Sequence, residues 1–446
     1  MITRIEAYNY RCFENLAIDL SRFHVLAGAN GSGKSTLLDI PVLLGELLTA
    51  RQIVDAFLDP SPTTGRPPRA LSLMELTHRG RGGAFGFAIE ARLPDEVADL
   101  IAESTRDPRF PAPTHLRYEL HLAPVDSGLG LEIVGEYLVL FHEDTPVRPI
   151  PGQQAFGDPD EVRDTGRGKS RRVQPVWLEH WRPVIARTRG PVVRFTPEAG
   201  RQGQQLKLRS QHSNLALDTV PFDDTQFPAA LWFRSMLWDG TALYAPEWSA
   251  LRQAAPPAGR EPKLDTQGRN IPWLALQLKR EDPALYDAWV DLVQLALPQV
   301  EAVEVTEREE DRHAYFRVTY SGGYKVTSSG LSDGTLRVLA LTLVPYLPRT
   351  PALLVTEEPE NGIYPQAIEV VMQSLRTVRG SQVLVATQSP LVLAQVSLAD
   401  VLATRMDPAT GAVTVVRGDQ HPRMADWHAD LDELDLGTLF ATGVFE

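Results

Sequence analysis

A glycine-rich stretch near the N-terminus has the residue types and the spacing that surround a phosphate group. It reads Gly28-Ala-Asn-Gly-Ser-Gly-Lys-Ser-Thr36, and it lies between a buried strand expected over residues 23–27 and a helix expected over residues 34–50. In this spacing the glycines let backbone N–H groups face the phosphates, the lysine reaches the β- and γ-phosphates, and the serine hydroxyl binds Mg²⁺. The residues expected to bind a nucleotide are Asn30, Gly31, Gly33, Lys34, Ser35 and Thr36.

Two adjacent carboxylates end an apolar run in the C-terminal half of the chain. The run Ala352 to Thr356 is followed directly by Glu357 and Glu358. Glu357 is expected to hold Mg²⁺, directly or through water, and Glu358 to orient and deprotonate an attacking water. Alone, such a pair also suits a helix cap or a solvated turn. The phosphate loop in the same chain favours the catalytic interpretation.

Two more motifs complete an ordered set. Leu331-Ser-Asp-Gly-Thr335 precedes an expected helix, and alone it would be an ordinary serine cap. Gln388 follows another apolar run, where a contact to the γ-phosphate is expected. ABC-type ATPases have these motifs in the same order along the chain: phosphate loop, long insertion, Leu-Ser-Asp-Gly signature, acidic pair and switch residue. In that class the signature serine meets the nucleotide of a second subunit, so Ser332 is expected to act in trans within a dimer.

Helices and strands are expected to alternate around these motifs. The expected elements are a helix at 334–347, a strand at 352–356, a helix at 365–378, a strand at 382–386 and a helix at 390–396. Such alternation implies a parallel sheet, which binds ligands at the carboxyl ends of its strands.

Other segments follow different periods. Apolar alternation over residues 85–93, 116–123 and 131–140 predicts an antiparallel β layer. Helical spacing over residues 273–297 predicts an inserted helical lobe. The predicted fold class is therefore α/β, an ABC-type ATPase head with a parallel-sheet core. The expected domains are an N-terminal ATPase lobe at 1–144, a basic and partly loop-like insertion at 145–225, the helical lobe at 226–299 and a C-terminal ATPase lobe at 300–446.

Strands are also expected at 300–305 and 314–326, joined by the charged run Glu307 to His313. That run is interpreted as a solvated hairpin tip, with a metal site as the alternative.

The charge of the chain is acidic but uneven. The net charge is −13, which argues against general attraction to nucleic acid. Residues 161–209 nevertheless hold twelve Lys or Arg against four acids. This stretch is interpreted either as a basic surface for double-stranded DNA or as a solvated loop. No apolar run is long enough to span a membrane and the N-terminus is charged, so a cytoplasmic protein is expected.

With these motifs assembled, the chain resembles the predicted-ATPase family in the SMC/RecF branch of the ABC ATPases, which is related to the ATPase half of the overcoming-lysogenization-defect nucleases. The segments that carry the resemblance, besides the four motifs, are Asn9 to Phe13, Gly268 to Pro272, Leu331 to Arg337, Glu357 to Pro365, Thr387 to Pro390 and Leu436 to Gly443. The resemblance implies an ATP-gated homodimer that uses Mg²⁺, with a separately encoded effector such as a nuclease in a bacterial anti-phage system. The family usually has His at the position of Gln388, and because Gln carries no titrating proton, slow or conditional hydrolysis is expected.

Two functions remain open from the sequence. One is an ATPase that senses DNA and controls an effector, and the other is an ATP-dependent scaffold that holds and releases a protein without contacting nucleic acid. A nuclease within the chain is rejected, because the part after Pro390 is shorter than the roughly 100-residue domain that it needs. Asp430 and Asp432, near His428, are interpreted as part of an acidic helical tail, with metal ligands as the alternative. Packing is the first interpretation for Cys12 and for the Trp177 and Trp181 pair, with base stacking as the alternative for the tryptophans.

Overall fold

The computed structural model describes residues 1–61, 64–104, 111–125, 130–145, 162–163, 171–172, 181–199, 205–210, 214–257, 259, 263–421 and 436–441. The chain divides into two compact units, each assembled from separate stretches of sequence. Unit 1 contains residues 1–21, 39–239 and 406–415, and unit 2 contains residues 22–38, 240–405 and 416–446. The four consecutive segments expected from the sequence are a different division, and they stay a prediction. The expected acidic tail around Asp430 and the residue Trp177 lie outside the described residues.

The strands that carry the motifs belong to a six-stranded sheet with the order β12-β16-β17-β3-β18-β19. The four pairings from β12 to β18 are parallel, which confirms the predicted parallel sheet. The bounds of its strands are β3 (Phe23–Ala27), β12 (Thr241–Leu243), β16 (Leu353–Glu357), β17 (Gln382–Thr387), β18 (Val401–Met406) and β19 (Val413–Arg417).

The helices predicted after the motifs are present, with somewhat different ends. They are α1 (Lys34–Leu47), α8 (Asp333–Leu343), α9 (Pro365–Arg376) and α10 (Pro390–Leu393), and α12 (Leu436–Ala441) follows near the C-terminus. Helix α8 ends before the predicted Leu347, since a 3₁₀ turn over Val344–Tyr346 replaces its last turn. Pro345 lies in this turn, and it has no backbone N–H to continue an α-helix.

The helical lobe predicted over residues 273–297 consists of two helices, α6 (Ile271–Glu281) and α7 (Pro283–Ala296). They are separated at Asp282, whose side chain accepts a hydrogen bond from the backbone N–H of Leu285 at 2.9 Å. Proline at the first helical position and an Asp cap both favour a new helix start over continuation.

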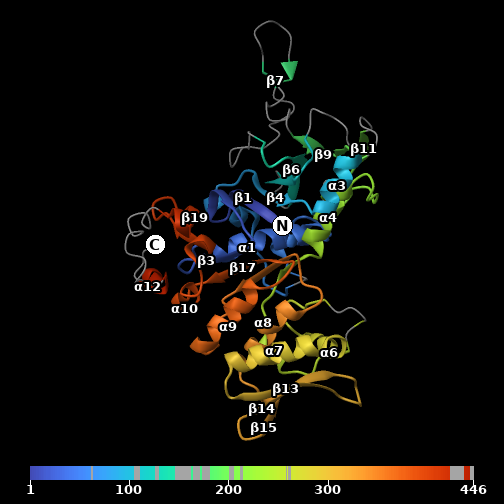
Figure 1. The fold of residues 1–446 in the computed structure, drawn as a ribbon. Helices are drawn as coiled ribbons and strands as arrows, with labels where there is room; N and C mark the ends of the chain where they lie inside the picture. The colour runs from blue at the N-terminus through green and yellow to red at the C-terminus, as the bar shows by residue number, and fades with distance from the viewer. Residues whose placement is uncertain are drawn as a thin grey trace. The chain divides into compact units, whose positions relative to one another are not determined.

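A three-stranded antiparallel sheet packs beside α6 and α7, as Figure 1 shows. Its strands are β13 (Val300–Glu307), β14 (Ala314–Tyr320) and β15 (Tyr324–Thr327). The charged run over residues 307–313 joins β13 to β14, which confirms the predicted hairpin tip. The core between these elements includes the fully buried Trp289, whose indole N–H donates to Thr342 Oγ1 at 3.1 Å.

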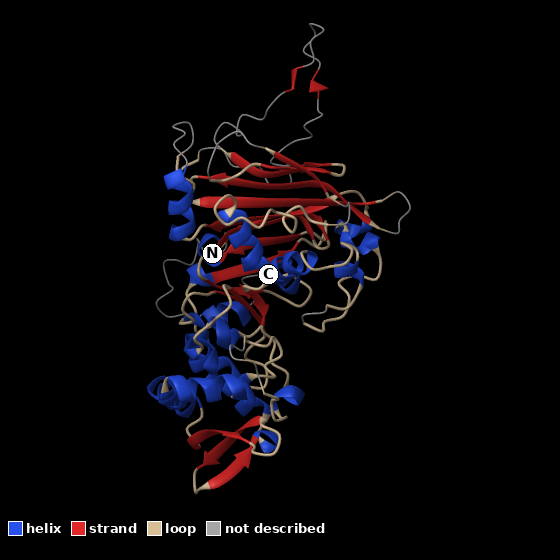
Figure 2. Cartoon of the chain, turned by 90° about the vertical axis from the view of Figure 1, so that its right-hand side faces the viewer, coloured by secondary structure: helices blue, strands red, loops and turns tan. Residues whose placement is uncertain are grey.

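Unit 1 is built on an eight-stranded antiparallel sheet with the order β11-β10-β9-β6-β5-β4-β1-β2, seen as long arrows in Figure 2. Its strands are β1 (Ile2–Tyr10), β2 (Phe13–Asp19), β4 (Phe85–Arg92), β5 (His115–Pro124), β6 (Leu131–Phe141), β9 (Arg182–Thr188), β10 (Val192–Phe195) and β11 (Leu206–Arg209). The predicted antiparallel layer is confirmed. Strands β9 to β11 come from the expected insertion, and they extend this sheet beyond β6.

Short helices complete the described part of unit 1. They are α2 (Asp55–Leu58), α3 (Asp95–Ser104) and α4 (Pro228–Trp238), while unit 2 adds α5 (Trp248–Leu251). Trp181 is fully buried and stacks on Phe141 with ring centroids 5.1 Å apart, so this tryptophan has a packing role. Within the described ranges, no helix has both the length and the apolar character that crossing a membrane requires.

Candidate functional site

The phosphate loop joins β3 to α1 within unit 2. Gly31 and Gly33 have φ of 79° and 85°, in the left-handed region that glycine adopts without a Cβ penalty. A Cβ on Gly28 would lie 2.1 Å from Thr404 Oγ1, so only glycine fits there as well. The glycine spacing read from the sequence is therefore required by the backbone.

Lys34 begins α1, and its buried side chain folds back over the loop. Its Nζ donates to the carbonyl oxygens of Gly28 and Ala29 at 2.6 and 2.9 Å. Burial lowers the pKa of Lys34, and the nearby carboxylates of Glu358 and Glu357 oppose that shift. The ammonium group is thus close to the acidic pair while neutral carbonyls hold it.

The parallel register brings three of the predicted motifs to one edge of the sheet. Ala27 pairs with Thr387, and Ala386 pairs with Glu357. The residues that follow these strands, namely Gly28, Glu358 and Gln388, therefore leave the sheet at the same edge. This is the edge at which parallel sheets bind ligands.

Glu358 has the most constrained geometry of the acidic pair. Its φ is 44°, a left-handed conformation that costs a non-glycine residue on the order of 1 kcal/mol or more. Its backbone N–H donates to Ala386 O at 2.7 Å. One carboxylate oxygen, Oε1, accepts from Gln388 Nε2 at 2.8 Å, and the other accepts from Asn361 Nδ2. Two neutral amides therefore fix the direction of this carboxylate.

The loop after the acidic pair is held by Arg337 from helix α8. Its Nη1 donates to the backbone oxygen of Glu358 at 3.2 Å and to that of Asn361. The guanidinium group lies 3.6 Å from the ring centroid of Trp248. Burial lowers the pKa of Arg337 to about 10, against the opposing effect of nearby acids. Sequence reasoning gave no role to Arg337 or Asn361, because neither stands in a motif that binds phosphate or metal.

A third acid, Glu360, lies in the same loop. Its carboxylate accepts a hydrogen bond from Thr387 Oγ1 at the end of β17. Burial raises the pKa of Glu360, although that hydrogen bond opposes the shift. The loop after β16 and the end of β17 are therefore joined by a side-chain contact in addition to the strand pairing.

Thr404 braces the phosphate loop from β18, and sequence reasoning missed it. Its Oγ1 donates to Ala27 O at 3.1 Å and lies 2.5 Å from Ser32 Oγ. Only the pairing of β18 with β3 brings this threonine close, and no local pattern around residue 404 indicates that pairing. The phosphate loop is thus supported by a strand that is distant in the sequence.

Ser332 caps helix α8, which is the ordinary role that the motif taken alone would give it, and its expected role in trans stays a prediction. Its Oγ accepts from the backbone N–H of Thr335 at 3.2 Å, and the side chain is exposed. Arg252 holds this loop by donating to Leu331 O at 2.6 Å and to Asp333 Oδ1 at 2.7 Å. Among the described residues, no hydrogen bond joins Ser332 to the phosphate loop. The structure therefore brings the other motifs together but leaves Ser332 facing solvent.

Gly334 lets the signature helix approach the loop that follows the acidic pair. A Cβ at this position would lie 2.5 Å from the carbonyl oxygen of Gly362. A larger residue would push helix α8 away from that loop, which also contains Asn361. The glycine of Leu-Ser-Asp-Gly is thus a packing requirement.

The remaining predicted residues carry polar groups of the kind that a magnesium nucleotide uses. Asn30 and Ser35 are exposed, while Thr36 and Glu357 are half-buried. Mg²⁺ prefers oxygen ligands and usually takes one or two protein groups together with phosphate oxygens. The Ser35 hydroxyl and the Glu357 carboxylate are oxygen ligands of this kind. The loop, with its inward-turning glycine backbone and Lys34, suits the phosphates.

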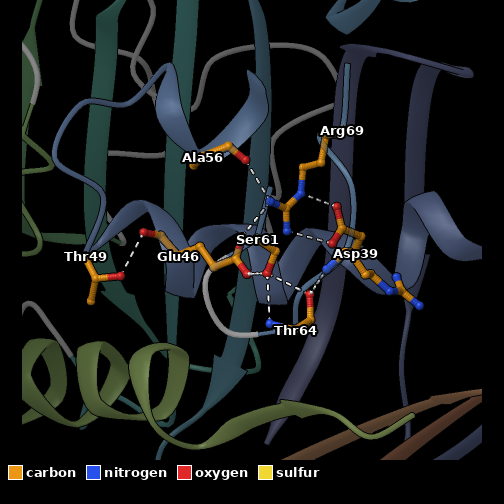
Figure 3. A network of polar contacts seen from close by, with 8 residues as sticks. Asp39, Glu46, Thr49, Ala56, Ser61, Thr64 and Arg69 are labelled. Carbon is orange, nitrogen blue, oxygen red and sulfur yellow. Dashed lines mark hydrogen bonds and ion pairs between the residues drawn. The ribbon is translucent and has the colours of Figure 1, made fainter. Parts of the chain in front are cut away.

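The later turns of helix α1, in unit 1, are anchored by the network in Figure 3. Arg69 donates to both carboxylate oxygens of Asp39 at 2.6 and 2.8 Å, and to Glu46 Oε2 and Ala56 O at 2.6 and 2.7 Å. The other Glu46 oxygen accepts from Ser61. Burial alone would lower the pKa of Arg69, but Asp39 and Glu46 raise the pKa by more than burial lowers it, so the net shift is upward. These charges satisfy one another and have a structural role.

Comparisons with known proteins support part of this picture. Residues 251–394 match the family described as "AAA domain, putative AbiEii toxin, Type IV TA system", a range that includes the signature, the acidic pair and the switch residue. No curated protein matches the chain.

Three solved structures resemble the chain at low identity. One is an Smc head bound to the C-terminal winged-helix domain of ScpA, at 12% identity and a TM-score of 0.49, covering 93% of this chain and 96% of that one. Another is an Smc head with an extended coiled coil, bound to the C-terminal domain of ScpA from Pyrococcus furiosus, at 10% identity, a TM-score of 0.48 and coverage of 93% and 95%. A third is the SMC head domain from Thermotoga maritima, at 12% identity, a TM-score of 0.38 and coverage of 93% and 98%.

Because these TM-scores are below 0.5, the three structures carry no argument about the family of this chain. The assignment rests on the family match and on the sequence motifs. The expected link to the overcoming-lysogenization-defect nucleases is tested by neither and stays a prediction. The match over residues 251–394 shows an AAA domain in that part of the chain, and together with the phosphate loop at residues 28–36 it supports an ATPase.

Proposed function

We propose that this ATPase works as a nucleotide-gated homodimer that controls an effector. The observation that carries the proposal is the convergence of the phosphate loop, Glu358 and Gln388 at one edge of the parallel sheet. The carboxylate of Glu358 is fixed in direction there and lies near Lys34. A water-activating group beside a phosphate cradle is the arrangement that hydrolysis of a phosphoanhydride needs.

Lys34 binds the β- and γ-phosphates, for which its ammonium group leaves the carbonyls of Gly28 and Ala29. Asn30, Gly31 and Gly33 shape the loop around the phosphates. Ser35 and Glu357 would hold Mg²⁺, directly or through water, and the ion would neutralise charge on the phosphate oxygens. Thr36 follows Ser35 in the first turn of α1.

Glu358 orients a water molecule and accepts its proton as the water oxygen bonds to the γ-phosphorus. The bond from that phosphorus to the bridging oxygen breaks, and ADP leaves with the bridging oxygen. Gln388 donates to Glu358 in this structure, and its amide is also suited to contact the γ-phosphate. Because glutamine does not titrate, it positions groups and carries no proton.

Ser332 completes the site from a second subunit. Its support is the exposed position at the N-terminus of α8, where N–H groups and the hydroxyl favour an anion. Dimer closure would thus require nucleotide, and hydrolysis would reopen the dimer.

Closure is tested by light scattering on the Glu358→Gln protein, with and without Mg-ATP. This variant should bind ATP, hydrolyse it slowly and accumulate as a dimer. Adding Ser332→Arg should keep it monomeric while ATP binding persists, because the long cation blocks contact in trans. A dimer that persists in the double variant would rule out the proposed role of Ser332.

The effector and the signal belong to the same proposal. We infer a bacterial defence role, supported by the resemblance described above and by the toxin and antitoxin wording of the matched family description. Double-stranded DNA is the proposed signal, and a separately encoded nuclease is the proposed effector. The cytoplasm is the compartment in which such a system would act.

The second candidate is a protein scaffold that contacts no nucleic acid. The surroundings of two basic residues in the 161–209 stretch favour it. Arg187 is fully buried and donates to Asn214 O at 2.7 Å. Arg189 pairs with Glu132 at 2.6 Å. The buried Arg187 offers no cation to a phosphate backbone, whereas Arg189 is 70% exposed and, among the described residues, is engaged only by this surface ion pair. Binding of the partner that stays constant across a salt series would support the scaffold, since phosphate contacts weaken steeply with salt.

A further inference from the structure

A cavity of about 260 Å³ lies in unit 2 beside the signature loop. Its polar lining residues are Arg252, Arg308, Tyr315, Thr327, Ser328 and Ser329. They come from the residue after α5, from the β13–β14 turn, from the start of β14, and from the end of β15 with the turn that follows. Apart from Arg252, which holds the signature loop, none of these side chains has a part in the proposed ATP site.

The two arginines supply most of the donors. Arg308 is exposed, and one of its terminal nitrogens contacts Asp311 Oδ2 at 2.8 Å. Arg252 donates to the carbonyl oxygens of Ser329 and Leu331 at 3.2 and 2.6 Å and to Asp333. A guanidinium group has five N–H donors, so each arginine keeps donors beyond these contacts.

The hydroxyls add donors on another wall of the cavity. Thr327 Oγ1 and Ser329 Oγ lie 3.1 Å apart, and only one of them donates in that contact. The other hydroxyl hydrogen is left to donate elsewhere. Ser328 is already used, since its Oγ accepts from the backbone N–H of Phe316 at 2.8 Å. Both Thr327 and Ser329 are exposed, so a ligand can reach them.

We infer that this cavity binds the phosphate group of a small molecule, either inorganic phosphate or a mononucleotide. Donors from three separate elements surround it, and a tetrahedral oxyanion accepts hydrogen bonds from several directions. A carboxylate accepts mainly in its own plane, which suits one arginine fork better than a ring of donors. Tyr315, half-buried in the wall, gives an aromatic surface beside the donors.

Occupancy of the cavity affects the signature loop through Arg252. The same guanidinium group lines the cavity and holds Leu331 O, one residue before Ser332. A phosphate that draws on Arg252 weakens that hold and shifts the loop. This consequence rests on the proposed role of Ser332, whereas binding in the cavity does not.

The binding test uses Lys34→Ala protein, whose phosphate loop no longer competes for ligand. Inorganic phosphate is titrated by calorimetry into this protein and into versions that also carry Arg308→Gln or Arg312→Gln. Arg312 is the matched control, because it is exposed, lies in the same turn and pairs with Glu307 outside the cavity. We expect saturable binding that Arg308→Gln weakens roughly tenfold or more and Arg312→Gln leaves unchanged. Absence of saturable binding, or equal losses in both variants, would overturn the proposal.

Further ligands and a second variant separate the sources of phosphate. AMP binding tighter than inorganic phosphate would assign the cavity to mononucleotides, and equal or weaker binding would assign it to phosphate itself. Acetate at the same concentration should not bind. Duplex DNA that binds through Arg308 while inorganic phosphate does not would overturn the small-molecule assignment. Thr327→Val, which keeps the charge and the shape, should weaken phosphate binding a few-fold, and an unchanged affinity would contradict the hydroxyl contact.

Coupling is measured separately in protein with an intact Lys34. Inorganic phosphate should change steady-state ATP turnover in the wild type at the concentrations that fill the cavity. In Arg308→Gln, the change in turnover at those concentrations should disappear. Binding in the cavity with an identical turnover response in both proteins would overturn the coupling through Arg252. A chain without ATP turnover would instead refute the proposed function, and the Lys34→Ala titration would still report on the cavity.

Discussion

Two regions of this molecule gather charged side chains, and they hold them in opposite ways. In the antiparallel sheet of unit 1, Arg117 is 2% exposed and donates to Glu6, Glu90 and Glu119 at 2.6, 2.8 and 2.5 Å. Each charge there has an opposite charge as its direct partner. At the edge of the parallel sheet, by contrast, Lys34 is held by carbonyl oxygens and Glu358 by amides.

This difference separates structural charges from charges that are available to a ligand. Burying a charge costs several kcal/mol, so the Arg117 cluster is stable only because its members neutralise one another. At the sheet edge the direct hydrogen-bond partners of Lys34 and Glu358 are neutral, although the two charges lie near one another. A phosphate or a water can then replace those partners.

Arg117→Met should lower the unfolding free energy by about 3–5 kcal/mol, because Glu90 and Glu119 lose this buried cation and Glu6 keeps only Arg4. Affinity for ATP per folded molecule should not change. Chemical denaturation and a nucleotide-binding titration measure the two quantities. Arg4→Met is the control, since Arg4 pairs with Glu6 and with the exposed Asp19 and should cost far less. Equal costs for the two variants would contradict the contrast.

Glu198 is a buried acid that depends on backbone donors. Burial raises its pKa to about 7, against the opposing N–H groups of Ala229 and Ala230 at 2.6 and 2.8 Å. Between the ordinary pKa of 4.5 and this value, the folded chain holds the proton more tightly than the unfolded chain. Its contribution to stability is therefore present below the lower value and is lost as the pH rises through the upper one, by up to about 3 kcal/mol.

Glu198→Gln removes the titration and keeps a carbonyl acceptor for one of the two N–H groups, while its NH2 replaces the oxygen that accepts from the other. Denaturation curves at pH 5 and pH 8 should therefore differ less for this variant than for the wild type. The same pH dependence in both proteins would mean that Glu198 is not the group that titrates.

Lys34→Ala should weaken ATP binding about a hundredfold, or about 2.7 kcal/mol, while stability changes little. The reason is that the ammonium group donates hydrogen bonds to neutral carbonyls in this structure, with the acidic pair nearby, and gains a directly bonded anion from nucleotide. Lys207→Ala, at an exposed position on β11, is the matched control and should bind ATP normally. ATP affinity that survives Lys34→Ala would remove the phosphate-loop assignment.

Gln388→Ala should slow turnover about tenfold with ATP affinity retained, because Glu358 loses one of its two orienting amides. Gln388→His restores the residue usual in the resembled family and should hydrolyse ATP at least as fast as the wild type. Single-turnover kinetics under saturating ATP measure this step. Unchanged turnover in Gln388→Ala would show that the hydrogen bond to Glu358 does not matter for catalysis.

Thr404→Val should cost about 1 kcal/mol of stability and weaken ATP binding a few-fold. The reason is that residue 404 then no longer forms hydrogen bonds to Ser32 in the phosphate loop and to Ala27 just before it. Thr404→Ser retains the hydroxyl and should behave more like the wild type. Thermal denaturation and ATP titration of the two variants give the comparison. Identical behaviour would mean that β18 does not support the loop.

The sequence predicted those parts of the site that are local in the chain. Glycine spacing, the acidic pair and the signature each depend on a few consecutive residues, and the alternation of helices and strands placed them on a parallel sheet. Thr404, Asn361 and Arg252 could not be found this way. Their contacts depend on which strands are neighbours and on how loops pack, and no local period reports either.

The division into units was also beyond the sequence. Residues 22–38 group with residues 240–405, because the parallel sheet joins β3 to strands more than three hundred residues later. Composition shifts indicate loops and segments, whereas compact units follow tertiary contacts. The break between α6 and α7 at Asp282 could not be predicted from the helical spacing alone, because it depends on the capping hydrogen bond of Asp282.

The central claim is that Glu358 activates water in an ATPase whose charged groups are kept available for ligand. The direct test is steady-state ATP turnover of the wild type and of Glu358→Gln, each with and without double-stranded DNA. The account predicts wild-type turnover that DNA stimulates, and a loss of at least about a hundredfold in Glu358→Gln with ATP binding retained. Turnover that depends on Glu358 but ignores DNA would favour the protein scaffold, and Glu358→Gln turning over at the wild-type rate would contradict the account.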